Sequence, residues 1–186
     1  MTHQVSKCYT NDSFGGNPNL DQKILIFENR VLYWHLEIAE LINNHMLDED
    51  QEGTLWNHAG FALLSLVFTY FEMIGQYRSG KPGSHPTKMF RKGITYVYPE
   101  KNFSKDQCGK IYNRVRCGMY HNAFIKKGTL IGRYDQSIEV ENGGNVKINP
   151  HSLSVDVNSN FKEYIKLLKD EDETELRANF EKMYDF

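Results

Sequence analysis

The feature that most constrains the fold is a long apolar segment that runs from about Leu55 to Tyr77. Its apolar residues fall on most sides of a helix, and a helix of that kind belongs at the centre of a bundle. Polar residues recur along it at heptad-like spacing, and together they form a narrow polar seam: His58, Ser65, Thr69, Glu72 and Gln76. Because buried polar groups need hydrogen-bond partners, we expect the polar seam to face polar groups on another helix.

The apolar centre of this segment, 59–74, is shorter than the roughly 20 residues of a membrane-spanning helix, and it includes Glu72. The first 19 residues are polar and do not resemble a signal peptide, so we expect residues 1–19 to be a flexible lead-in. Three cysteines without CxxC spacing fit a reducing compartment. The sequence thus predicts a cytoplasmic protein with no membrane partner.

A second apolar stripe defines a helix that precedes the apolar segment. Its members recur by threes and fours, which is the spacing of one helix face: Leu20, Ile24, Phe27, Val31, Trp34, Ile38 and Leu41. We expect this helix to end near 43–45, with an acidic loop at 48–52, and the whole stripe to face the core.

Two further helices are predicted before the helical pattern gives way to alternating, β-type residues. A short one spans about 87–97. Ser104 and Gln107 then form a capping-box pattern that opens a third long helix. We expect this helix to continue to about Lys127 and to end at Gly128, since glycine commonly terminates helices.

Alternating residues around the turn 142–145 predict a β-hairpin at about 136–149. Leu153, Val155 and Val157 also alternate and fit a third strand, and helices are predicted at about 159–169 and 172–184. The expected fold class is mainly α: an up-and-down helical bundle with a small C-terminal β-hairpin, in one domain over 20–186.

Charge is distributed unevenly along the chain. Residues 81–133 contain twelve Lys or Arg and two acidic residues, whereas 1–80 and 134–186 are acidic, and the net charge is −2. That net charge excludes a generic polyanion binder, but the basic island suggests a phosphate-containing partner, plausibly RNA. We take Lys110, Lys126 and Lys127 of this island as candidate RNA-binding residues.

The run 112–122 (YNRVRCGMYHN) places two arginines and a histidine within the third long helix. An imidazole can move a proton near neutral pH, and a guanidinium can hold phosphate oxygens with two parallel hydrogen bonds. We therefore take Arg116 and His121 as catalytic candidates. Arg114, Asn122 and Glu72 are supporting candidates, Glu72 because an acid of the polar seam would orient an arginine.

Arg116 and His121 with four residues between them, on the last long helix of an apolar bundle, resemble the Arg-x4–6-His motif of the HEPN superfamily (higher eukaryotes and prokaryotes nucleotide-binding domain). The resemblance covers roughly residues 20–168. Cys117 stands where many members have a polar residue such as asparagine. The resemblance implies Arg116 as the motif arginine and His121 as the motif histidine.

Many HEPN domains are metal-independent endoribonucleases that act as dimers, and others are non-catalytic modules that bind RNA or protein. The resemblance therefore implies RNA and a second copy of the chain as partners. By analogy with defence and toxin–antitoxin systems, it also suggests a neutralising protein partner.

Other interpretations of the motif remain open. Its arginine can pair with Glu72 for purely structural reasons, which leaves a non-catalytic binding module. Cys117 and His121 have the spacing of metal ligands on one helix face, but no second pair completes a zinc site. A cysteine nucleophile lacks an orienting acid nearby. We expect neither a metal nor a cofactor.

Overall fold

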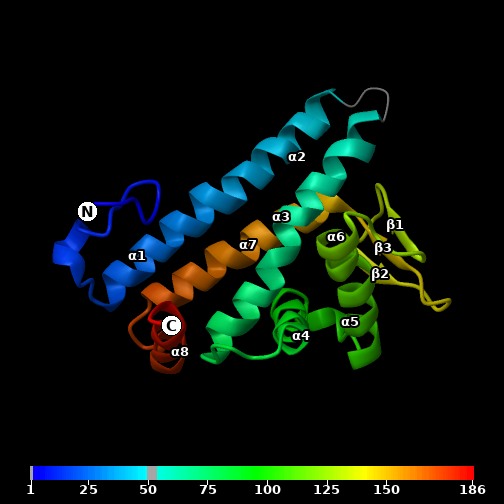
Figure 1. Ribbon diagram of the computed structural model, residues 1–186. Helices are drawn as coiled ribbons and strands as arrows, with labels where there is room; N and C mark the ends of the chain where they lie inside the picture. The colour runs from blue at the N-terminus through cyan, green and yellow to red at the C-terminus, as the bar shows by residue number, and fades with distance from the viewer. Residues whose placement is uncertain (1, 50–53) are drawn as a thin grey trace.

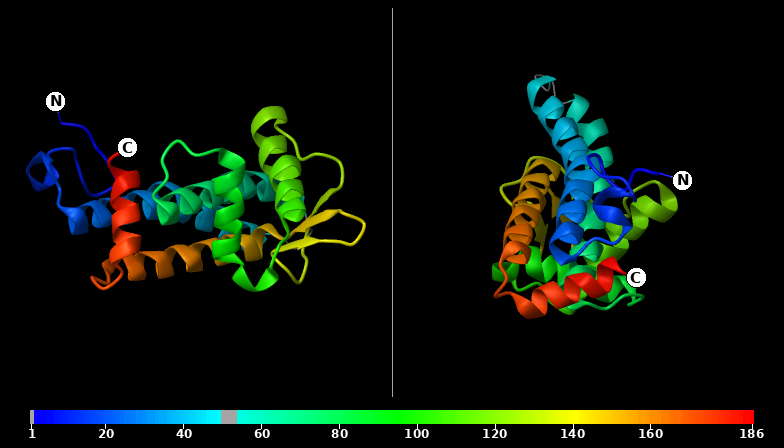
Figure 2. Two further views of the ribbon diagram at one scale, coloured as in Figure 1. Left: turned by 90° about the horizontal axis from the view of Figure 1, so that it is seen from below. Right: turned by 90° about the vertical axis from the view of Figure 1, so that its left-hand side faces the viewer.

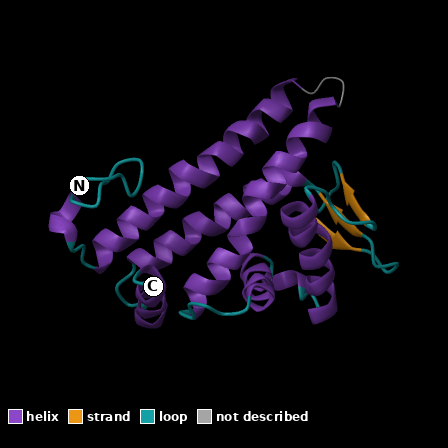
Figure 3. Cartoon of the chain, viewed as in Figure 1, coloured by secondary structure: helices purple, strands orange, loops and turns teal. Residues whose placement is uncertain are grey.

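The computed structural model describes residues 2–49 and 54–186, and the side chains outside 46–58. The side chains of the acidic stretch at 48–52 and of His58 therefore lie outside the described residues. Helices make up 67% of the chain and strands 6%, which confirms the predicted mainly α fold (Figure 3).

Three long rods lie side by side in the bundle (Figure 1). The first joins α1 (Leu20–Val31), the π-helical turn η2 (Leu32–Leu36) and α2 (Glu37–Glu49). The second is α3 (Thr54–Ser79), and the third is α7 (Pro150–Lys169). Both α3 and α7 run antiparallel to the first rod, and α8 (Thr174–Tyr184) closes the end at which both termini lie (Figures 1 and 2).

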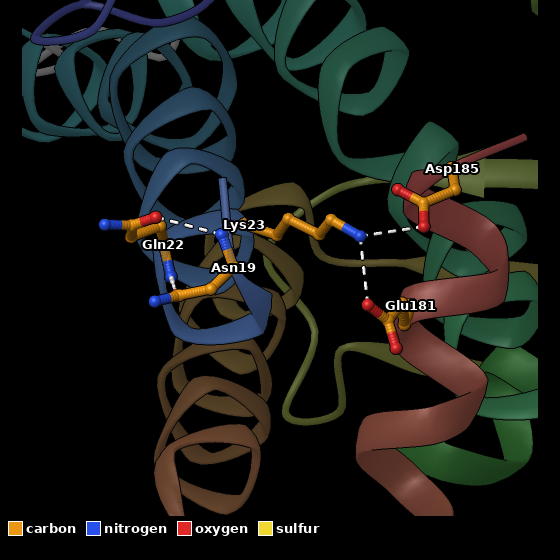
Figure 4. Close-up of polar contacts among 5 residues, drawn as sticks. All are labelled: Asn19, Gln22, Lys23, Glu181 and Asp185. Atoms are coloured by element: carbon orange, nitrogen blue, oxygen red, sulfur yellow. Dashed lines mark hydrogen bonds and ion pairs between the residues drawn. The ribbon is translucent and has the colours of Figure 1, made fainter. Parts of the chain in front are cut away.

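The first rod begins at a capping box. The side chain of Asn19 accepts a hydrogen bond from the backbone of Gln22, and the side chain of Gln22 accepts one from the backbone of Asn19 (Figure 4). Lys23 then crosses to α8, where its Nζ lies 2.9 Å from Glu181 and 2.8 Å from Asp185 (Figure 4). These contacts fasten the two ends of the chain together.

The segment before α1, which we expected to be a flexible lead-in, makes contacts to the bundle. Arg30 donates to the carbonyl of Val5 at 2.9 Å, and the backbone of Cys8 donates to the side chain of Asn29 at 3.0 Å. Part of the segment forms the 3-10 helix η1 (Ser13–Gly16). Side chains of α1 thus hold the backbone of residues that carry no helical signal of their own.

The apolar stripe predicted along the first rod faces the core only in its first half. Ile24, Phe27 and Val31 are buried, but the exposed fractions of Trp34, Ile38 and Leu41 are 47%, 44% and 65%. From the last residue of the π turn onward, the buried positions are instead Leu36, Ala39 and Asn43. A π turn inserts one residue, so it rotates the following helix and turns the expected stripe outward.

The helix α3 is the centre of the bundle, as predicted. It contacts the first rod, α4, α7 and α8, and its fully buried residues include Leu63, Leu64, Val67, Phe68, Phe71 and Ile74. Residues Ala59–Ser79 have the length and composition of a membrane span, but half of their most apolar window is buried within the protein. That placement is the one expected of a core helix.

Glycines bring α4 (Pro86–Val97) very close to α3. A Cβ at Gly93 would collide with the carbonyl oxygen of Phe71, and one at Gly75 would collide with that of Met89. The 3-10 turn η3 (Pro99–Lys101) then leads to α5 (Lys105–Ile111), which begins at the predicted capping box of Ser104 and Gln107.

The third long helix consists of α5, the π turn η4 (Tyr112–Arg116) and α6 (Cys117–Asn122). It ends five residues before the predicted end at Lys127, because Ala123 adopts a left-handed conformation with φ 52°. The chain then folds back over Gly118, where a Cβ would lie 2.6 Å from the carbonyl oxygen of Phe124. Gly128, expected as the terminator, instead precedes a strand.

The small sheet contains the predicted hairpin. Strands β2 (Ile138–Val140) and β3 (Val146–Ile148) pair antiparallel, and β1 (Thr129–Ile131) pairs parallel with β3 on its other side. The third strand predicted at 153–157 is wrong, since these residues belong to α7. Asn149 caps that helix and Pro150 opens it, so the apolar residues recur at helical spacing instead.

Candidate functional site

The polar seam of α3 meets the motif helix at an ion pair between Glu72 and Arg116. Nε of Arg116 donates to Oε1 at 2.5 Å, and Nη2 donates to Oε2 at 3.3 Å. Both side chains are about one-fifth exposed, at 16% and 21%. The contact confirms the prediction that Glu72 lies within hydrogen-bond reach of a motif arginine. Glu72 leaves Nη1 for another acceptor.

Two tyrosines flank this guanidinium. Its central carbon lies 4.7 Å from the ring centroid of Tyr120 and 5.6 Å from that of Tyr112. These distances are typical of cation–π contacts. Partial burial lowers the pKa of Arg116, but the Glu72 carboxylate outweighs this, and the pKa is raised overall. Arg116 is therefore a fixed, permanently charged group.

The polar seam continues past Glu72 toward the first rod. Tyr120 donates to the backbone carbonyl of Ser65 at 2.9 Å, and its phenol also lies beside Thr69. Thr69 in turn lies 3.0 Å from Nε2 of His35, which is 2.7 Å from the carbonyl oxygen of Leu66. Burial lowers the pKa of His35, so its imidazole is neutral near pH 7.

Sequence reasoning missed His35, Tyr112 and Tyr120 as members of this site. The two tyrosines lie four residues on either side of Arg116, a spacing that places side chains on one helix face. That spacing was a usable signal. His35 had no comparable signal, because only the π turn at 32–36 brings it to α3.

Arg114 makes a different set of contacts from Arg116. Its Nη1 donates to the carbonyl oxygens of Gly128 and Gly144, at 3.1 Å and 2.6 Å. These residues lie just before β1 and in the β2–β3 turn. Arg114 therefore ties the motif helix to the sheet, which assigns it a structural role that the sequence did not suggest.

His121 and Asn122 lie at the exposed end of α6. Among the described residues no hydrogen bond joins His121 to Arg116. Tyr120, which stacks on Arg116, immediately precedes His121 in the chain. The site thus comprises a guanidinium fixed at the seam and an imidazole open to solvent at the end of the same helix.

The three lysines predicted to bind RNA are on the surface around this helix. Nζ of Lys110 pairs with Asp106 at 2.8 Å, and Nζ of Lys126 lies 3.5 Å from the side chain of Asn113. Lys126 and Lys127 are exposed in the segment that folds back after α6. The structure does not bring them into contact with Arg116.

Within the described residues no group of three or more His, Cys, Asp or Glu is arranged to hold a metal ion. Cys117, which has metal-ligand spacing to His121, is half-buried beside Arg116. Comparison with protein-family models, with curated proteins and with solved structures finds no match to this chain.

Proposed function

We propose that this chain is a HEPN-like, RNA-directed protein, and that it acts as a metal-independent endoribonuclease through Arg116 and His121. The observation that carries the proposal is the oriented Arg116 guanidinium. Glu72 fixes its plane with two hydrogen bonds, while the exposed His121 lies five residues later on the same helix. A positioned cation can stabilise the charge that develops in phosphodiester transfer, and a solvent-accessible imidazole can move a proton.

In the proposed reaction the ribose 2′-oxygen attacks the adjacent phosphorus and the 5′-oxygen leaves. His121 takes the proton from the 2′-hydroxyl or gives one to the leaving oxygen. Arg116 stabilises the negative charge that develops on the non-bridging phosphate oxygens, through Nη1 and its field. The products are a 2′,3′-cyclic phosphate and a 5′-hydroxyl, and no step needs a metal ion.

One imidazole is a small set of groups for a reaction that needs both an acid and a base. We propose that a second copy of the chain supplies the other, in a two-fold dimer with residues 114–122 near the axis. Exposed apolar side chains support an interface on this side of the helix: Tyr120 is 45% exposed and Phe124 is 65% exposed. Light scattering that finds a monomer at micromolar concentration would count against the composite site.

The test is RNA cleavage followed on a denaturing gel in excess EDTA. Wild-type protein is expected to cleave and to leave 2′,3′-cyclic phosphate ends, and His121→Ala is expected to lose cleavage by roughly 10²–10⁴-fold, the usual contribution of a general acid or base. His3→Ala is a matched control, since His3 is an exposed histidine of the N-terminal segment, outside the site. Cleavage that needs added magnesium would contradict the proposed mechanism.

A second function has a specific observation in its favour. Arg116 is only 21% exposed in its side chain and is already paired with Glu72, as a structural arginine would be. In that case the chain is a non-catalytic module that binds nucleic acid or protein through the same surface. If the wild-type protein binds RNA but does not cleave it, this alternative is supported. We propose a cytoplasmic location for either function.

A further inference from the structure

A pocket of 430 Å³ lies between α4 and α5, on a part of the surface that the motif does not use. Its cations come from both helices, since Lys88 and Arg91 belong to α4 and Lys105 opens α5. The remaining lining consists of His85, Thr87, Cys108 and Gly109. Among the residues described, no acidic side chain lines this pocket.

These cations keep their charge available. Among the residues that the structure describes, no ion pair forms to Lys88, Arg91 or Lys105. Burial raises the pKa of the Cys108 thiol, so the thiol stays protonated and does not neutralise them. Three like charges around one pocket repel each other, and an anion bound there would relieve that repulsion.

Two neighbouring hollows share lining residues with this pocket, and together the three form a longer basic surface. Arg91 and Lys105 also line a hollow with Lys92, Tyr96 and Phe103. Lys105 and Gly109 also line a hollow that reaches Lys110 and Arg114. Its acidic residue, Asp106, is already paired with Lys110 at 2.8 Å.

This basic groove (Lys88, Arg91, Lys92, Lys105 and Lys110) presents cations along its length and two half-buried aromatic rings, Tyr96 and Phe103, in one of its hollows. Cations that follow a backbone and rings on which bases stack are the combination that binds single-stranded nucleic acid. A small anion would need only the first pocket, whereas the two hollows that share its residues extend the cationic surface beyond it. We propose that the basic groove binds the backbone of single-stranded RNA, at a site separate from Arg116 and His121.

The inference rests on the proposed function only for the choice of RNA as the nucleic acid. Lys105 and His121 are sixteen residues apart on nearly continuous helix, which corresponds to roughly 24 Å along the axis. The part of the basic groove around Lys105 therefore holds a part of the strand away from His121. Its loss should weaken binding of long substrates without changing the chemistry.

The test uses fluorescence anisotropy with a single-stranded 2′-O-methyl RNA, which lacks the nucleophilic hydroxyl and stays intact. Lys88→Gln/Lys105→Gln removes two exposed cations of the basic groove. Each lost contact to a single-stranded phosphate should lower the slope of log affinity against log salt by about 0.7, and the affinity near 0.1 M salt by roughly tenfold in all. The control Lys162→Gln/Lys182→Gln removes two exposed lysines of α7 and α8, so the net charge is matched.

Groove and control variants that bind the RNA equally well would overturn the inference, as would a preference for duplex RNA or full competition by AMP at matched phosphate concentration. The proposed function fails separately. If the groove variant loses binding but the wild-type protein cleaves nothing, the groove stands and the endoribonuclease does not. If cleavage depends on His121 while the groove variant binds normally, the reverse holds.

Discussion

Two π-helical turns approach α3 from opposite sides of the polar seam, and they differ in what they bring to it. The turn η2 delivers His35, a neutral imidazole that bonds to the carbonyl of Leu66 and to Thr69. The turn η4 delivers Arg116, a fixed cation that pairs with Glu72. The first contact satisfies partly buried polar groups, while the second pairs a cation with a carboxylate in a partly exposed site.

The two turns also differ in their effect on the helices that contain them. After η2 the buried face moves by one residue and leaves Trp34, Ile38 and Leu41 outside. Across η4 the buried positions Ile111, Val115 and Met119 keep a regular four-residue spacing. A π turn is therefore not a functional signal by itself. The chemistry of the side chains that it presents to the seam decides its role.

The largest expected effect tests which positions of the first rod η2 turns toward the core, and it compares substitutions at two positions. Leu36→Ala should lower the free energy of unfolding by about 2–5 kcal/mol, because Leu36 is 3% exposed and its removal leaves a cavity. Ile38→Ala should change it by less than about 0.5 kcal/mol, as surface substitutions do. Urea unfolding measures both. Equal losses would mean that the helix continues without the shift.

Breaking the contact at η4 should have the next largest effect. Glu72→Gln removes the charge that Arg116 faces in a site about one-fifth exposed, and should cost about 1–3 kcal/mol of unfolding free energy. Glu163→Gln is the control, since Glu163 pairs with Lys166 at 3.8 Å on the exposed face of α7. If the two variants lose the same stability, the Glu72–Arg116 pair does not differ from a surface pair.

A smaller loss is expected at the first arginine of η4. Arg114→Lys replaces the guanidinium that bonds to the carbonyls of Gly128 and Gly144, and should cost about 1 kcal/mol. The loss should be local, so amide hydrogens of β1 and β3 should exchange faster than those of α7. Uniform acceleration throughout the chain would contradict a local tie between the motif helix and the sheet.

The smallest effect concerns pH and η2. The pKa of His35 is lowered from 6.5 by burial, so the unfolded chain binds this proton more readily than the folded one. Its contribution to stability is therefore present above about pH 6.5 and is lost as the pH falls below that value. When the pH is lowered from neutral to mildly acidic, the free energy of unfolding should fall less for His35→Gln than for the wild-type protein. Identical pH profiles would place His35 in an exposed position.

The sequence predicted the parts of this molecule that depend on one helix or one turn. The central α3, the capping box at Ser104 and the hairpin around 142–145 follow from local patterns, and the pairing of Glu72 with a motif arginine followed from the need of a buried acid for a partner. The early end of α6 did not follow, because it depends on the chain folding back over Gly118.

The remaining errors have the same physical origin. Leu153, Val155 and Val157 fit both a strand and a helix, and the cap at Asn149 decides between them. The reversal of Trp34, Ile38 and Leu41 depends on one extra residue in a turn of the same helix, which periodicity cannot locate. The split between Arg114 and Arg116 depends on tertiary contacts to the sheet and to α3.

The central claim is that η4 holds one arginine for chemistry and the other for structure. The most direct test measures RNA cleavage and urea unfolding together for Arg116→Lys and Arg114→Lys. An ammonium cannot reproduce the planar fork, so Arg116→Lys should lower cleavage per folded molecule by roughly 10²-fold or more. Arg114→Lys should lower stability and leave that rate within about twofold of wild type, as expected of a residue outside the reaction. Equal losses of cleavage in the two variants, or none in Arg116→Lys, would contradict the account.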